Sequence, residues 1–137
     1  MTEDLFGFIG LGNMGRPMAQ NIISRNIPLI VHDLAGTRER SPDKSIIAVS
    51  NQDLAKKAKV IALSLPNLES NKSVIREIAD VAKRGTVVVD TCTIGPQAAA
   101  ENKEVLQTAG ISYLDSPVSG LKFRAEEGAL VSMVAGD

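Results

Sequence analysis

The fold of this 137-residue chain is decided by the stretch Leu5-Phe6-Gly7-Phe8-Ile9-Gly10-Leu11-Gly12-Asn13-Met14-Gly15. Its apolar first half, residues 5–9, is typical of a strand and runs directly into a G-x-G-x-x-G motif. Residues 13–25 then form a predicted helix, because Met14, Met18 and Ile22 recur at four-residue spacing. A strand, a glycine-rich turn and a helix in this order predict a loop that binds a diphosphate.

Each glycine of the motif has its own predicted role. Gly10 allows a tight turn, Gly12 lets a diphosphate approach the backbone, and Gly15 lets the helix pack closely on the strand. The free N–H groups and the dipole at the start of the helix also favour a negatively charged group. The predicted cofactor-binding loop also includes Leu11, Asn13 and Met14.

A carboxylate completes the sequence pattern of a dinucleotide-binding site. Asp33 ends a predicted strand over residues 29–33, where it can accept hydrogen bonds from the adenosine ribose of NAD or NADP. Its charge repels a 2′-phosphate, which favours NAD. Arg38 and Arg40 follow shortly, and arginine is the usual partner of that phosphate, so NADP stays an alternative.

The rest of the chain alternates strands with helices. Such alternation predicts parallel strands joined by right-handed crossovers, hence an α/β, doubly wound, mostly parallel sheet of the Rossmann type. One such domain would span residues 1–137, with its ligand crevice at the carboxyl ends of the strands. Residues 35–45 are expected to form a loop or a short helix. The further predicted helices are 50–58, 70–82 and 97–109, and the further strands are 46–49, 60–65, 86–90, 111–115 and 129–135.

Composition and charge exclude several classes of function. The 15 basic and 16 acidic residues nearly cancel without a basic patch, which disfavours nucleic acid as a partner. No apolar run reaches the ~20 residues needed to span a bilayer. The acidic N-terminus is unlike a secretory signal, and a single cysteine allows no internal disulfide. A cytoplasmic location and no membrane partner are expected.

Polar loops follow three other predicted strands. Asn67 after strand 60–65 is expected to offer hydrogen bonds to the cofactor, or else to form a simple turn. Hydroxyls in Asp90–Pro96 would face the nicotinamide ribose. Ser119 and Gly120 can offer a hydroxyl and backbone N–H groups to the carboxylate of a small hydroxy acid.

Two reactive side chains are interpreted as structural. Cys92 has no histidine partner in prospect, because His32, the only histidine, ends a strand on the adenosine side. Cys92 is therefore expected to be a small buried residue, and His32 to pack or hydrogen-bond locally.

Together these motifs resemble the β-hydroxyacid dehydrogenases. The likeness rests on the glycine motif continued to Asn21, on Asp90–Pro96, on Asp115–Leu121 and on Gly128-Ala129-Leu130. It implies that Gly10–Gly15 bind the pyrophosphate and Asp33 the ribose. Two positions differ from the family pattern: Cys92 replaces a usual serine and Leu121 a usual glycine. The resemblance also implies that the nicotinamide side is lined by Leu65, Pro66 and Thr93, and that the substrate loop includes Ser119, Gly120 and Leu121.

The resemblance implies an NAD(P)-dependent oxidoreductase that transfers a hydride to or from a small β-hydroxy acid, similar to 3-hydroxyisobutyrate or tartronate semialdehyde. Its general acid/base would be a lysine in a helical C-terminal domain. No lysine here matches that motif, and Lys122 matches it poorly. The chain is therefore expected to hold an incomplete Rossmann domain without catalytic residues and to be inactive alone. A non-catalytic NAD(P)-binding module and an imine or ketone reductase of the same superfamily are the alternatives.

A homo-oligomer is also expected. Without the helical domain, the apolar surface that it would cover and the unfinished sheet edge are free to pair with a second copy of the chain.

Overall fold

Six parallel strands form the central sheet in the computed structural model, which describes residues 4–136. Their order is β3-β2-β1-β4-β5-β6, so β1 lies inside the sheet, between β2 and β4. This order confirms the predicted doubly wound fold, because the chain runs outward from β1 in both directions. The strands are β1 (Phe6–Ile9), β2 (Leu29–His32), β3 (Ile46–Ile47), β4 (Val60–Leu63), β5 (Val87–Asp90) and β6 (Ser112–Asp115).

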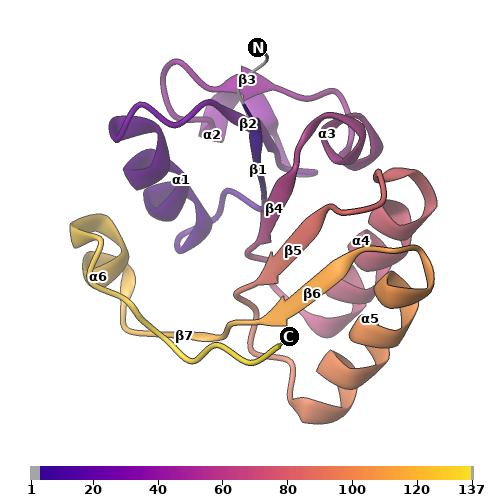
Figure 1. Cartoon of the computed structure of the whole chain (residues 1–137). Helices are drawn as coiled ribbons and strands as arrows, with labels where there is room; N and C mark the ends of the chain where they lie inside the picture. Colours follow the sequence, from indigo (N-terminus) through magenta and orange to yellow (C-terminus); the bar gives the residue numbers. More distant parts are fainter. Residues whose placement is uncertain (1–3, 137) are drawn as a thin grey trace.

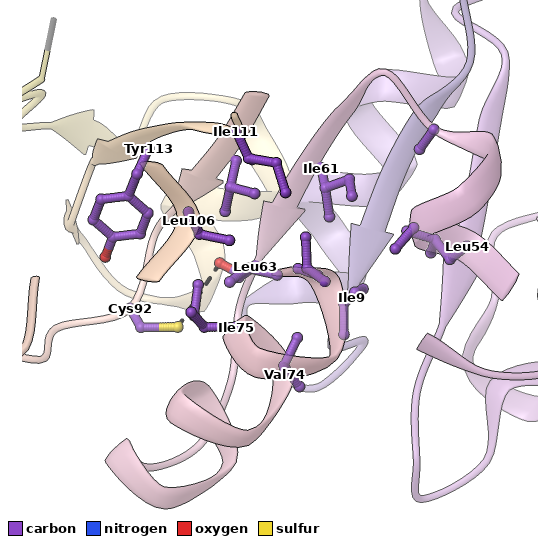
Figure 2. Packing of buried hydrophobic residues seen from close by; sticks show 14 of the residues in the cluster. Ile9, Leu54, Ile61, Leu63, Val74, Ile75, Cys92, Leu106, Ile111 and Tyr113 are labelled. Atoms are coloured by element: carbon purple, nitrogen blue, oxygen red, sulfur yellow. Dashed lines mark hydrogen bonds between the residues drawn. The ribbon is translucent and has the colours of Figure 1, made fainter. Parts of the chain in front are cut away.

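Helices cover both faces of the sheet (Figure 1). Alternate residues of β1 show the division, since Phe8 packs in the core that includes Ala19 of α1, and Ile9 in the opposite core with Leu54 and Ile75. Figure 2 shows that second core between the sheet and helices α3 and α4. The helices around the sheet are α1 (Gly15–Ser24), α2 (Thr37–Arg40), α3 (Asn51–Lys57), α4 (Leu68–Val81) and α5 (Pro96–Thr108).

Polar side chains determine where two helices begin. The Oγ atom of Ser50 accepts a hydrogen bond from the Asp53 N–H at 3.0 Å, and Asp53 accepts one from the Val49 N–H. Ser50 is therefore the N-terminal cap of α3. Helix α4 begins two residues earlier than the predicted helix 70–82, because Asn67 Oδ1 accepts the Ser70 N–H at 2.8 Å.

The last segment of the chain differs from the prediction. The expected sheet strand over residues 129–135 is wrong: only β8 (Val131–Ser132) is a strand there, and it pairs antiparallel with β7 (Val118–Ser119). Between them lies α6 (Lys122–Glu127), which the sequence reasoning missed. The chain turns back at Gly128, in left-handed conformation, instead of crossing over to extend the parallel sheet. Ala135 then bridges to Asp115 at the end of β6.

Candidate functional site

The glycine loop leaves the carboxyl end of β1 between its two neighbouring strands. The Gly10 N–H donates to the carbonyl oxygen of His32 at 3.0 Å, and the Ser64 N–H donates to that of Ile9 at 2.9 Å. Gly10 has a φ of +99°, and a Cβ there would lie 2.0 Å from the Ser64 carbonyl oxygen. A Cβ on Gly15 would lie 1.9 Å from the Gly10 carbonyl oxygen. The fold itself therefore requires glycine at both positions.

Gly12 is different, because nothing in the protein requires its lack of a side chain. A Cβ at Gly12 would have no atom within 4 Å, and the residue lacks a positive φ. The open space in front of the loop is where a diphosphate would contact the backbone. This free approach is the observation that fits the loop to a dinucleotide.

Asp33 lies against this loop at the end of β2. Its Oδ2 accepts the Leu11 N–H at 2.7 Å, and its Oδ1 accepts the Ala35 N–H at 2.8 Å. The guanidinium of Arg40 lies 3.6 Å from Oδ2. The predicted ribose-binding carboxylate and the predicted diphosphate loop are thus in direct contact.

A cavity of about 240 Å³ opens at the glycine loop. It lies over Gly12 and the start of α1, so it occupies the position predicted for the cofactor phosphates. Three of its lining side chains are cationic and come from three helices. The cavity is lined by Leu11, Gly12, Asn13, Arg16, Pro17, Arg40 and Lys122.

The loops after β4 and β5 are held together by Cys92. The Leu65 N–H donates to its sulfur at 3.2 Å, and the side chain is 7% exposed. Burial raises the pKa of the thiol to about 12, with a further contribution from the Asp90 carboxylate. Cys92 therefore stays protonated and is a structural residue, as predicted.

His32 also has the expected local role. It is buried, and its Nδ1 lies 2.7 Å from Asn51 Oδ1 at the start of α3. The two predicted structural residues therefore tie loops and helices to the sheet and do not form a Cys–His pair.

A buried hydrogen-bond network below the loop after β5 was missed by the sequence reasoning. Asp90 is fully buried and its Oδ2 accepts from Asn71 Nδ2 at 2.8 Å and from the Tyr113 hydroxyl at 2.7 Å. Its Oδ1 accepts the Cys92 N–H, and Asn102 donates to Asn71. Burial raises the pKa of Tyr113.

The signal for this network was present in the sequence. Asn71 continues the apolar stripe of Val74, Ile75 and Ile78 on α4, and Asn102 lies on the same face of α5 as Leu106. A polar residue in a buried stripe must find a partner. Here the partners hold the start of the loop that carries Thr93.

The remaining predicted site residues lie at the same edge of the sheet, on exposed loops. Thr93 is exposed after β5, and Asn67 has its side-chain oxygen engaged as the cap of α4. Ser119 and Gly120 are exposed at the end of β7, followed by exposed Leu121. Gly120 has a φ of +139°, and a Cβ there would lie 2.8 Å from the Leu130 side chain.

Asp115 lies beside Asp90, its partner in the parallel register of β5 and β6. Partial burial and the negative charge of Asp90 raise the pKa of the Asp115 carboxyl. Across residues 4–136, no group of histidine, cysteine, aspartate and glutamate side chains could hold a metal ion. No helix in that range is long and apolar enough to cross a membrane.

Comparison with known proteins identifies similar domains. The family model described as the NAD binding domain of 6-phosphogluconate dehydrogenase matches residues 5–137. The mitochondrial 3-hydroxyisobutyrate dehydrogenase of Rattus norvegicus is 36% identical over 135 residues, which cover 95% of this chain. The chain spans 40% of the length of that relative.

Two solved structures have the same architecture. A Mycobacterium tuberculosis 3-hydroxyisobutyrate dehydrogenase with L-serine matches with a TM-score of 0.89 and 27% identity, over 99% of this chain and 47% of its own. Psf3 in complex with NADP+ and 2-OPP matches with a TM-score of 0.87 and 28% identity, over 96% of this chain and 49% of its own.

Proposed function

Since this chain belongs to the family of the NAD binding domain of 6-phosphogluconate dehydrogenase, we propose that it is the cofactor-binding part of an NAD(P)-dependent dehydrogenase of small β-hydroxy acids. The observation that carries the proposal is the open approach to Gly12 between two glycines that the fold requires and beside Asp33. A relative named for 3-hydroxyisobutyrate makes a similar substrate, a small carboxylate with a β-hydroxyl, the best candidate.

The chain's own residues would bind and orient the reactants. NAD(P), when bound, supplies the hydride chemistry at its nicotinamide ring. The Gly10–Gly15 loop would hold the diphosphate with backbone N–H groups, and Asp33 would accept hydrogen bonds from the adenosine ribose. The nicotinamide end would be lined by Leu65, Pro66, Asn67 and Thr93, and the substrate carboxylate would be held by Ser119, Gly120 and Leu121.

We assign proton transfer to no residue of this chain. The resemblance gives that role to a lysine in a helical domain, and no lysine among these 137 residues matches its motif. The chain alone would then bind cofactor without sustained turnover. The nearly balanced charge, 15 basic against 16 acidic residues, supports a small-molecule partner over nucleic acid.

NAD is the favoured cofactor. A 2′-phosphate would approach the Asp33 carboxylate, whose charge opposes it. Arg40, which could offset that repulsion, lies 3.6 Å from Asp33 and interacts with it already. Replacement Asp33→Asn should therefore reduce the preference for NADH over NADPH, measured by fluorescence titration of each. An unchanged preference would show that Asp33 does not determine which cofactor binds.

The test of the proposal is titration of the chain with NADH, together with replacement Gly12→Ala. The added methyl group has free space, so the midpoint of thermal unfolding should stay close to that of the parent. NADH binding should weaken about tenfold or more, because the methyl group keeps the diphosphate off the backbone. Gly10→Ala is the matched control: it should lose stability as well, since its Cβ meets a backbone oxygen. Unchanged NADH affinity in a folded Gly12→Ala variant would contradict the assignment.

A further inference from the structure

Lys122, the first residue of α6, lines the same cavity as Gly12 although the two are far apart in the sequence. We propose that the cationic side chains of Lys122 and Arg16 bind the diphosphate of the dinucleotide. Helix α6 would then be part of the cofactor site. The inference rests on the dinucleotide-binding function proposed above and adds residues that the glycine motif does not contain.

Helix α6 is held against α1, which brings Lys122 to the loop. The side-chain amide of Asn21 on α1 donates to the carbonyl oxygen of Ala125 at 2.7 Å, and Ala125 is 1% exposed. Figure 1 shows α6 lying beside α1, away from α4 and α5 on the other side of the sheet. The position of Lys122 is therefore set by packing and hydrogen bonding of its own helix.

Both ends of α6 depend on glycine. At its start, the positive φ of Gly120 directs the chain from β7 into the helix, in a space closed by Leu130 and Arg124. At its end, Gly128 adopts the left-handed conformation and its N–H donates to the Ala125 carbonyl oxygen. Three features thus hold this short helix in place: the hydrogen bond from Asn21 and a glycine at each end.

Two of the three cationic side chains that line the cavity, those of Arg16 and Lys122, are available to bind a ligand. Arg16 has no ion pair among residues 4–136. The Lys122 side chain is 61% exposed, and among residues 4–136 its ion-pair partner is Glu126, which is 56% exposed and whose Oε1 lies 3.9 Å from the Lys122 Nζ. Such a pair contributes little, so the ammonium group is free to move toward a ligand. Arg40 is engaged with Asp33 and stays on the adenosine side.

A dinucleotide diphosphate carries two negative charges, and the glycine loop offers only backbone dipoles to them. The guanidinium of Arg16 and the ammonium of Lys122 would supply two matching positive charges. Lys122 also follows Ser119 by three residues. Binding of the diphosphate at Lys122 would therefore order the turn proposed to hold the substrate carboxylate, and would link cofactor binding to substrate binding.

The experiment compares Lys122→Gln with the parent chain by titration with NADH, ADP-ribose and adenosine. The loss of a charge-assisted contact should weaken NADH and ADP-ribose binding about tenfold, and by the same factor for both. Adenosine binding should not change, because adenosine has no phosphate. The affinity of the variant for ADP-ribose should also depend less on ionic strength, and Lys122→Arg should restore most of the affinity.

Lys83→Gln is the matched control. Lys83 is an exposed lysine in the turn before β5, at the edge of the sheet opposite the glycine loop, and its replacement should leave all three affinities unchanged. Unchanged ADP-ribose affinity in Lys122→Gln, or a loss of NADH affinity that ADP-ribose does not share, would overturn the inference, since the second result places Lys122 away from the diphosphate. Failure of the parent chain to bind NADH and ADP-ribose would instead overturn the proposed function.

Discussion

At the scale of single residues, the loop after β5 depends on a buried thiol. Cys92 has a pKa of about 12 in the folded protein against an ordinary value of 9.0, chiefly because of burial. Thiol reagents attack the thiolate, so native Cys92 should react far more slowly at about pH 8 than Cys92 in the urea-unfolded chain. Equal rates in the two states would show that the loop opens freely.

The same thiol makes the free energy of unfolding depend on pH in the alkaline range. The unfolded chain releases this proton near pH 9.0 and the folded chain only near pH 12, so below pH 9.0 the two states bind equal numbers of protons. The free energy of unfolding should therefore fall as pH rises between these values. Urea denaturation along this range should show a shallower fall in Cys92→Ala, which lacks the group. Tyr113, whose pKa is also raised, would account for part of the remaining slope.

Asp115 gives a pH dependence at the acidic end. Partial burial and the neighbouring Asp90 raise its folded-state pKa, so ionised Asp115 opposes folding at neutral pH. Asp115→Asn should unfold at a higher temperature than the parent near pH 7, and the difference should disappear as pH falls below the usual carboxyl pKa of about 4. A difference that persists unchanged in acid would assign the effect to something other than charge.

At the scale of elements, β5, β6, α4 and α5 are joined through the Asp90 carboxylate. The Tyr113 hydroxyl donates to it from β6 at 2.7 Å, and Asn71 donates to it from α4. Asn102 of α5 in turn donates to Asn71. Tyr113→Phe removes one donor to a buried charge and should lower the free energy of unfolding by about 2 kcal/mol.

A double-mutant cycle isolates that bond from other effects of the substitution. Tyr113→Phe should cost less in an Asp90→Asn background, with a coupling of about 1 kcal/mol or more by urea denaturation. Additive losses would mean that the hydroxyl acts independently of Asp90. The network matters for the site because it fixes the start of the loop that bears Thr93.

At the scale of the whole molecule, an apolar strip on α6 and β8 remains uncovered. Its members are each between 51% and 69% exposed, which is unusual for large apolar side chains clustered within one short segment. The strip is Leu121, Phe123, Val131, Met133 and Val134. The homo-oligomer expected from the sequence predicts that a second copy of the chain covers this strip.

Light scattering at several protein concentrations tests this association. The parent should shift from monomer to dimer as concentration rises, and Phe123→Glu should remain monomeric because a charge cannot be buried there without a partner. Leu34→Glu is the control, since Leu34 is 93% exposed but lies outside the strip, after β2. A parent that is monomeric throughout would contradict the dimer.

The sequence by itself determined the α/β alternation, the glycine-rich turn after β1 and the carboxylate at the end of β2. Hydrophobic spacing and glycine placement are local signals, and they suffice where a strand, a turn and a helix follow one another directly. The parallel pairing of β1 and β2, which brings Asp33 to Leu11, is seen only in the structure.

Only the tertiary structure decided the end of the chain and what meets at the cavity. The apolar run of residues 129–135 has the composition of a sheet strand, yet the chain there turns back antiparallel, and α6 docks on α1 through Asn21 and Ala125. Those two residues are 104 positions apart. The place where a short apolar segment packs depends on the space that the rest of the fold leaves open. A local sequence pattern carries no information about that space, so the sequence predicted the role of Gly12 but not that Lys122 lines the same cavity.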